Sequence, residues 1–208
     1  MLILIADDHS VVRKGLILLL AEKYPYAHYE EVADGADLLK KILTITYTII
    51  ISDISMPGKS GLEIIKEVKA IAPKTPLLVL SVHSPEEYAV RAIRAGASGY
   101  LTKDCAPEEL IIAIEYLLSG KRYITAEIAE LLADSCSSDY TKEPHECLSN
   151  REFEVFKLLT SGKSNSDIAS TLSLSVNTIN SFRERIQKKM HMHSKTEIIK
   201  YAVEHKLV

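Results

Sequence analysis

Five polar side chains that could take part in covalent chemistry stand at or just after the ends of short apolar runs. They are Asp7, Asp8, Asp53, Ser81 and Lys103. Three carboxylates brought together repel one another unless a cation offsets their charge, and such an oxygen-rich site suits Mg²⁺ (or Mn²⁺) better than Zn²⁺. A divalent cation and a lysine would also neutralise an incoming phosphoryl group. The set therefore predicts transfer of a phosphoryl group onto a carboxylate.

The role of each residue follows from its position. Asp53 stands alone after its apolar run, so it is the predicted nucleophile, whereas the adjacent Asp7 and Asp8 would hold the metal. Ser81 would add a hydroxyl donor, and Lys103 would add a second cation. Each residue taken alone has an ordinary explanation, because aspartate after a strand is often a turn residue or a helix cap. Their joint occurrence at successive strand ends favours a reactive site.

The first 120 residues alternate between short apolar runs and segments with helical periodicity. The predicted strands are Leu2–Ala6, His28–Ala33, Thr48–Ser52, Leu77–Ser81 and Gly99–Leu101. Strands separated by helices imply right-handed crossovers and a parallel sheet, which gathers functional groups at the carboxyl ends of its strands. We predict an α/β fold, a doubly wound five-stranded parallel sheet of order 2-1-3-4-5. The first and third strands are neighbours in this order, so Asp7, Asp8 and Asp53 would converge.

The rest of the chain has a different pattern. Residues 121–148 are predicted to be a linker, in which Thr125–Ala133 could form one short helix and Asp134–Cys147 is polar. Residues 149–208 show only helical periodicity. Serine followed three residues later by an acid, a capping signal, occurs at Ser149, Ser164 and Ser194, and Ser175 begins a further helix. We predict four short helices in a small all-α domain.

Composition and charge are consistent with two domains of different function. The chain has 208 residues, of which 47% are apolar and 25% charged, an ordinary globular balance. Residues 149–208 carry a net charge of +4 and the remainder −7, which suggests a sensing or catalytic domain joined to a nucleic-acid module. Apolar runs are too short for a membrane helix. Three widely spaced cysteines, Cys105, Cys136 and Cys147, favour a reducing cytoplasm.

The first 120 residues resemble the receiver domain of bacterial two-component response regulators. The resemblance rests on the five polar residues above and on Met56-Pro57-Gly58, which follows Asp53 at the usual spacing. It implies that Asp7, Asp8, Asp53 and the backbone carbonyl of Ser55 bind Mg²⁺. It also implies that Asp53 accepts the phosphoryl group.

The same resemblance implies a switch next to the phosphorylated residue. Ser81 would turn toward the phosphoryl group, Lys103 would pair with it, and Tyr100 would be the aromatic switch residue that follows Ser81 inward. His83 occupies a position that tunes dephosphorylation in such domains, although an ordinary surface histidine is the simpler interpretation.

The C-terminal part is similar to the LuxR-type helix-turn-helix domain of the NarL/FixJ family. The matching segments are LSNREFEV at 148–155, KSNSDIASTL at 163–172 and SVNTI at 175–179. The resemblance implies that residues 175–189 form the recognition helix, which enters the major groove of double-stranded DNA. The predicted DNA-binding residues are Asn177, Thr178, Asn180, Ser181, Arg183, Arg185, Lys188 and Lys189.

These DNA-binding residues are expected to differ in role. The arginines and lysines would neutralise phosphates, Asn180 and Ser181 could read base edges, and Asn177 and Thr178 would donate to phosphates or cap the helix. The sequence departs from its relatives at Asn180 and Glu184, where they are commonly basic or base-reading, and at Phe182, where they often have histidine. Glu184 would repel phosphate if it faced DNA.

Together, these features predict a DNA-binding response regulator that a sensor histidine kinase phosphorylates on Asp53. Phosphorylation would control DNA binding and transcription, and the active form would be a homodimer with the last helix, about Lys195–Glu204, as a contact by family resemblance. The receiver would catalyse only its own phosphorylation and dephosphorylation, so we do not expect an enzyme that turns over a substrate.

Two alternatives remain open. A metal-dependent phosphohydrolase would also form an aspartyl-phosphate, but such enzymes usually need a second acid two residues after the nucleophile, where this chain has Ser55. A DNA-binding protein whose receiver is regulated by protein contact, without phosphorylation, is the other alternative. Turnover of small phosphate esters would favour the first, and failure to form an acyl phosphate would favour the second.

Overall fold

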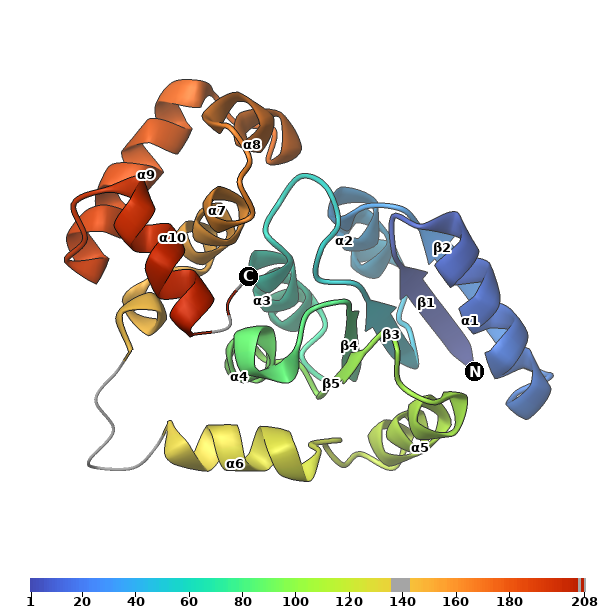
Figure 1. The fold of residues 1–208 in the computed structure, drawn as a ribbon. Helices are drawn as coiled ribbons and strands as arrows, with labels where there is room; N and C mark the ends of the chain where they lie inside the picture. The colour runs from blue at the N-terminus through green and yellow to red at the C-terminus, as the bar shows by residue number, and fades with distance from the viewer. Residues whose placement is uncertain (136–142, 206, 208) are drawn as a thin grey trace. The chain divides into compact units, whose positions relative to one another are not determined.

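The computed structural model describes residues 1–135, 143–205 and 207 (Figure 1). The chain forms two compact units, Met1–Asp134 and Ser135–Val208. None of the described helices has the length and hydropathy needed to cross a membrane. Residues 136–142, which include Cys136 and half of the polar stretch predicted as linker, lie outside the described residues.

The first unit contains a five-stranded parallel sheet of order β2-β1-β3-β4-β5, which confirms the predicted fold class and strand order. The strands are β1 (Leu2–Ala6), β2 (His28–Val32), β3 (Ile49–Ser52), β4 (Leu77–Ser81) and β5 (Gly99–Thr102). Strands β3 and β4 are buried along their whole length, as expected for central strands covered on both faces. Because Ala6 pairs with Ser52 across β1 and β3, the chain leaves both strands at the same level of the sheet.

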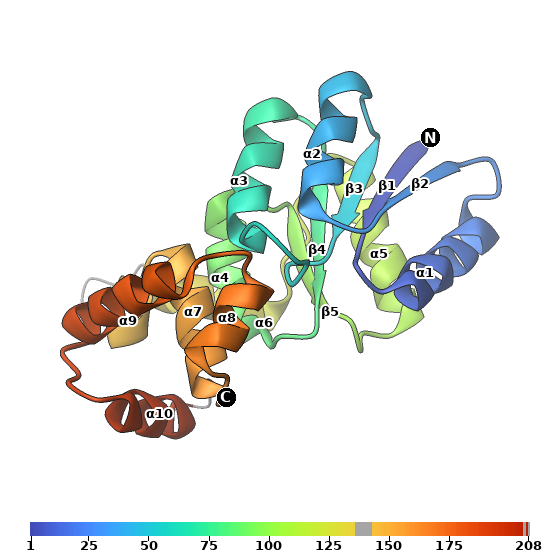
Figure 2. The ribbon, with the colours of Figure 1, turned by 90° about the horizontal axis from the view of Figure 1, so that it is seen from above.

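Helices cover both faces of the sheet. The helices of this unit are α1 (Ser10–Lys23), α2 (Gly35–Thr44), α3 (Gly61–Ile71), α4 (Pro85–Ala95), α5 (Pro107–Leu118) and α6 (Ala126–Asp134). Figure 2 shows α1 and α5 on one face and α2 and α3 on the other. Leu20 of α1 and Ile114 of α5 pack in one buried cluster with Ile3, Ile5 and Ile51 of the sheet. Each such fully buried side chain contributes about 1.5–3 kcal/mol to the free energy of unfolding. This core therefore holds the strand ends in fixed positions.

Local signals in the sequence predict helices α4 and α6. Ser84-Pro85-Glu86-Glu87 is typical of a helix start, with serine at the cap and proline in the first turn. Ser84 is the N-cap of α4 and Pro85 its first residue, as predicted, but the side chain of Ser84 does not cap the helix. Instead, the backbone N–H of Glu87 donates to the carbonyl of Ser84 at 3.2 Å. The short helix predicted near Thr125–Ala133 is α6, which packs against α4 and so belongs to the first unit.

The second unit is all-α, as predicted. Its elements are a 3₁₀ turn η1 (Pro144–Cys147) and the helices α7 (Asn150–Thr160), α8 (Asn165–Thr171), α9 (Val176–Met190) and α10 (Lys195–Glu204). Ser149 and Ser164 form complete capping boxes with the acids three residues later, and Ser175 caps α9. Ser194 also caps its helix, but the Glu197 carboxylate accepts from the backbone N–H of His193 instead of completing the box.

Candidate functional site

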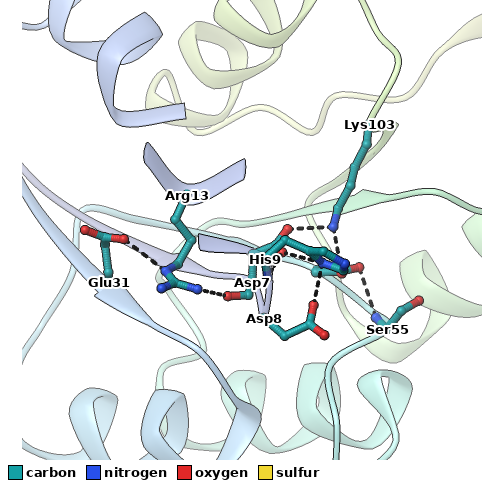
Figure 3. Close-up of polar contacts among 8 residues, drawn as sticks. Asp7, Asp8, His9, Arg13, Glu31, Ser55 and Lys103 are labelled. Atoms are coloured by element: carbon teal, nitrogen blue, oxygen red, sulfur yellow. Dashed lines mark hydrogen bonds and ion pairs between the residues drawn. The ribbon is translucent and has the colours of Figure 1, made fainter. Parts of the chain in front are cut away.

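The carboxyl ends of β1, β3 and β5 bring two aspartates and one lysine into contact (Figure 3). Asp7 and Asp53 are buried, with 2% and 4% of their surface exposed. The Nζ atom of Lys103 lies 2.6 Å from Oδ2 of Asp7 and 2.8 Å from Oδ2 of Asp53. One ammonium group therefore bridges two buried carboxylates.

Asp8 and His9 form the solvent-facing side of this pocket. Nδ1 of His9 lies 2.8 Å from Oδ1 of Asp8 and 3.3 Å from Oδ1 of Asp7. One potential ligand atom from each of Asp7, Asp8, His9 and Asp53 lies within 4.8 Å of all the others. His9 was not among the predicted site residues, although its place directly after the acidic pair was a signal.

Arg13, from the first turn of α1, holds the chain that leaves β1. Its Nη1 donates to the carbonyl of Asp7 at 2.6 Å, and its Nε donates to Glu31 Oε2 at 2.9 Å. Figure 3 shows Arg13 between Glu31 and the main chain of Asp7. The guanidinium thus fixes the position of Asp7 from behind the pocket. Arg13 was not among the predicted site residues, because its partner Glu31 lies on β2, far from it in sequence.

The loop after β3 closes tightly around Asp53. The exposed Ser55 donates its backbone N–H to Oδ1 of Asp53 at 3.0 Å; the neighbouring carbonyl of the same residue is the predicted metal ligand. Farther along the loop, a Cβ atom on Gly61 would lie 2.0 Å from the carbonyl oxygen of Ile54. Only glycine allows this close approach, so α3 begins directly against the strand end that carries Asp53.

The predicted switch residues are linked to one another through His83. Ser81 is fully buried, and its Oγ accepts the backbone N–H of His83 at 3.1 Å. Tyr100 has only 1% of its surface exposed, and its hydroxyl donates to the His83 carbonyl at 2.8 Å. The ring of His83 stacks on Tyr88 of α4. Tyr100, the predicted aromatic switch residue, therefore lies inward in this structure. His83 is half-buried and links it to Ser81, so it is not a free surface histidine.

The second candidate site is the exposed face of α9. Ile179, Ile186 and Met190 are buried against the other helices. The opposite face carries the exposed residues Asn177, Ser181, Glu184, Arg185 and Lys188. Four of the predicted DNA-binding residues thus share one face of one helix, and Glu184 lies among them.

The other predicted DNA-binding residues of α9 have partners or partial burial within the unit. Oδ1 of the half-buried Asn180 accepts from Nδ2 of Asn165 at 2.8 Å. Nζ of Lys189 lies 2.6 Å from Oε2 of the buried Glu152. Thr178 bonds to the N-cap Ser175, and Arg183 is half-buried. The structure therefore does not place all eight residues on one open surface.

Comparison with known proteins shows the family of the chain. The family model of the response regulator receiver domain matches residues 3–115, and that of bacterial regulatory proteins of the luxR family matches residues 146–202. The chain belongs to the NarL/FixJ family of response regulators. The two matched regions of this response regulator contain the acidic pocket and helix α9, respectively.

Relatives of the response regulator match it along nearly its whole length. Response regulator UvrY of Escherichia coli (strain K12) is 33% identical over 206 residues, which cover 99% of this chain and 94% of that protein. Oxygen regulatory protein NreC of Staphylococcus haemolyticus is 34% identical over 215 residues, which cover 100% and 99%. A solved structure of RcsB from Salmonella enterica serovar Typhimurium, bound to promoter P1flhDC in the presence of phosphomimetic BeF3⁻, has 26% identity and a TM-score of 0.67, with 97% of each chain covered.

Burial and ion pairs shift the pKa values of Lys103, Tyr100 and Cys105 in the receiver domain of this response regulator. Burial alone would lower the pKa of Lys103, but its hydrogen bonds and ion pairs with Asp53 and Asp7 outweigh burial and raise the pKa above 10.5. Lys103 is therefore a cation throughout the physiological pH range. Burial raises the pKa of Tyr100, which stays a neutral hydrogen-bond donor. Burial also raises the pKa of Cys105 to about 11, so this side chain is a thiol and not a reactive thiolate.

Glu152 is expected to make the helical unit sensitive to acid. Burial would raise the pKa of this carboxyl, but hydrogen bonds from Lys189 and Ser149 outweigh burial and lower the pKa below 4.5. Because the folded pKa lies below the unfolded one, the carboxylate stabilises the unit fully above about pH 4.5, and this contribution is lost as the pH falls through the folded pKa. Glu152→Gln should destabilise the unit by about 1–2 kcal/mol at pH 7, measured by hydrogen exchange of the α7 amides in the full chain. The difference from wild type should shrink below pH 4.5; a difference that stays constant would show that the charge of Glu152 does not stabilise the unit.

Proposed function

We propose that a sensor histidine kinase phosphorylates this response regulator on Asp53, and that phosphorylation controls DNA binding by residues 149–208 and hence transcription. The observation that carries the proposal is the bridge from Lys103 to Asp7 and Asp53. It places one cation beside a buried carboxylate at the edge of a parallel sheet. The same chain carries a LuxR-type domain.

The donor set fits a hard divalent cation. Asp7, Asp8 and Asp53 supply three carboxylates against the single ammonium of Lys103 in this pocket, which leaves negative charge for a metal to offset. Oxygen ligands with an open, solvent-facing side suit Mg²⁺ or Mn²⁺. Asp7, Asp8, Asp53 and the carbonyl of Ser55 would hold the ion. When bound, it would supply charge neutralisation to the phosphoryl oxygens.

The residues of the chain would carry out the transfer. An oxygen of Asp53 forms a bond to phosphorus, the phosphorus–nitrogen bond of the donor phosphohistidine breaks, and the released imidazole takes a proton from solvent. Lys103 is released from Asp53 and pairs with the phosphoryl oxygens. The hydroxyl of Ser81 donates to the same group. The receiver thus promotes its own phosphorylation and dephosphorylation without turning over a separate substrate.

The readout would pass through the Ser81–His83–Tyr100 link. A turn of Ser81 toward the phosphoryl group would change its bond with the backbone of His83, whose carbonyl accepts from Tyr100. Ser81 is the last residue of β4, and Tyr100 lies in β5, which packs against α4. A local change in charge would therefore alter this face of the receiver and bias a two-state element.

The output would be binding of double-stranded DNA in the bacterial cytoplasm by a homodimer. Asn177, Ser181, Arg185 and Lys188 lie on the open face of α9, where a recognition helix contacts the major groove. Helix α10 presents Thr196, Lys200 and the 62%-exposed Val203 on one side, and we propose this side as the dimer contact.

The proposal is tested by labelling with a small phosphodonor. The full chain is incubated with radiolabelled acetyl phosphate and Mg²⁺, beside Asp53→Asn and a control, Asp37→Asn, in a surface residue paired with Lys40. Wild type and the control should take up about one hydroxylamine-sensitive phosphoryl group per chain, and Asp53→Asn none. Equal labelling of wild type and Asp53→Asn would overturn the assignment. Continuous release of phosphate from a small phosphate ester over many turnovers would favour the phosphohydrolase, and no labelling of any protein would favour regulation by protein contact.

The same samples test the link to DNA. Mobility shifts with the promoter region of the chain's own gene, with and without acetyl phosphate, should show a change in affinity of about tenfold in the wild type and none in Asp53→Asn. An unchanged affinity in the labelled wild type would show that phosphorylation does not control DNA binding.

A further inference from the structure

The side chain of His9 lies in the acidic pocket. His9 is the N-cap residue of α1, but its side chain does not cap the helix. Its backbone N–H donates to Oδ1 of Asp7 at 2.8 Å, so the main chain is satisfied without the ring. The ring instead brings Nδ1 to 2.8 Å from Asp8 and 3.3 Å from Asp7. Across residues 1–135, 143–205 and 207, these residues and Asp53 are the only group of three or more potential ligands placed closely enough to share one ion.

The ion pair between His9 and Asp8 does not account well for the position of the imidazole. The side chain of His9 is 67% exposed and that of Asp8 is 33% exposed, and ion pairs at exposed positions contribute little to stability. Lys103 already contacts the buried pair, Asp7 and Asp53. His9 approaches the same carboxylates from the solvent side, where Asp8 also lies. The imidazole therefore faces the part of the pocket that a cation could enter.

We propose that His9 is a metal ligand through Nδ1, and that it extends the pocket from a magnesium site to one that also selects divalent transition-metal ions. The proposal rests on the metal site of the proposed function and adds a nitrogen donor to it. Carboxylate and carbonyl oxygens suit Mg²⁺ and Mn²⁺, whereas imidazole suits ions such as Ni²⁺ and Zn²⁺. Affinity for a mixed nitrogen and oxygen site rises along the series from Mn²⁺ to Ni²⁺.

Metal titrations of the untagged full chain test this role. His9→Gln is compared with wild type and with His28→Gln, a matched change of an exposed histidine on β2. The affinity for Ni²⁺ should fall about tenfold or more in His9→Gln, while the affinity for Mg²⁺ stays within about twofold. His28→Gln should bind both ions as wild type does. Because His191 and His193 could also bind Ni²⁺, binding that persists in Asp8→Asn is subtracted.

A spectroscopic measurement tests the ligand directly. Pulsed electron paramagnetic resonance of Mn²⁺ bound to wild type should show modulation from a directly coordinated nitrogen nucleus, which His9→Gln should lack. Mn²⁺ binding without nitrogen modulation, together with equal Ni²⁺ affinities of wild type and His9→Gln, would overturn the role of His9 and leave the proposed function intact. If wild type bound neither Mg²⁺ nor Mn²⁺, the metal site of the proposed function would itself be wrong.

Discussion

Lys103→Met should slow phosphoryl transfer to Asp53 by about 100-fold or more. The ammonium of Lys103 is held between Asp7 and Asp53, where it can meet the charge that develops on the transferring group. Removing one such preorganised donor typically costs a factor of 10²–10³ in rate. The rate is measured as incorporation of label from acetyl phosphate at saturating Mg²⁺. Lys59→Met, which removes an exposed lysine paired with Glu67, should label at the wild-type rate.

The same substitution should also make thermal stability depend more strongly on the Mg²⁺ concentration. Without Lys103, two buried carboxylates lie close together with less charge to offset them. Loss of one partner from a buried ion pair costs about 3–5 kcal/mol. An ion that binds only the folded state restores stability as its concentration rises. Thermal unfolding should therefore show a larger rise in Tm with Mg²⁺ for Lys103→Met than for wild type. Labelling of Lys103→Met at the wild-type rate would show that Lys103 has only a structural role.

The parts of the structure that were predicted from sequence depend on local signals. Strands β1, β3 and β4 are nearly continuous apolar runs, because central parallel strands are buried on both faces. The strand order was predicted as the usual order of a five-stranded doubly wound sheet, and it places the strands that precede Asp7 and Asp53 side by side. The caps at Ser149 and Ser164 need only residues three positions apart. Where a cap competes with backbone geometry, as at Ser84, the same signal predicted the helix start but not its hydrogen bond.

What was missed depends on residues that are distant in sequence. Arg13 fixes the main chain of Asp7 only because β2 brings Glu31 alongside. The partner of Lys189 is Glu152, 37 positions away, so a count of basic residues could not separate it from its neighbour. The inward position of Tyr100 is a matter of rotamer and packing. Sequence patterns therefore predict which residues come together in the fold, but they do not predict the individual contacts that determine the role of each residue.

Lys188→Met should mainly weaken DNA binding, whereas Lys189→Met should mainly lower the stability of the helical unit. Lys188 is on the exposed face of α9, so its loss should weaken DNA binding several-fold and reduce the slope of log affinity against log salt by about 1. Lys189 neutralises the buried Glu152, so its loss should destabilise the helical unit by about 1–3 kcal/mol and change the salt slope little. Both properties are measured on the full chain, by fluorescence anisotropy with labelled DNA and by hydrogen exchange of α7 and α9.

Glu184 provides the complementary change on the same face. It is exposed between Ser181 and Lys188, so its carboxylate would repel nearby phosphates. Glu184→Gln should therefore strengthen DNA binding several-fold at low salt without changing stability, and the gain should shrink as salt screens the charge. Should Glu184→Gln leave affinity unchanged while Lys189→Met alone reduces the salt slope, α9 would contact DNA through the side that carries Lys189. The three variants together thus test which face of α9 contacts DNA.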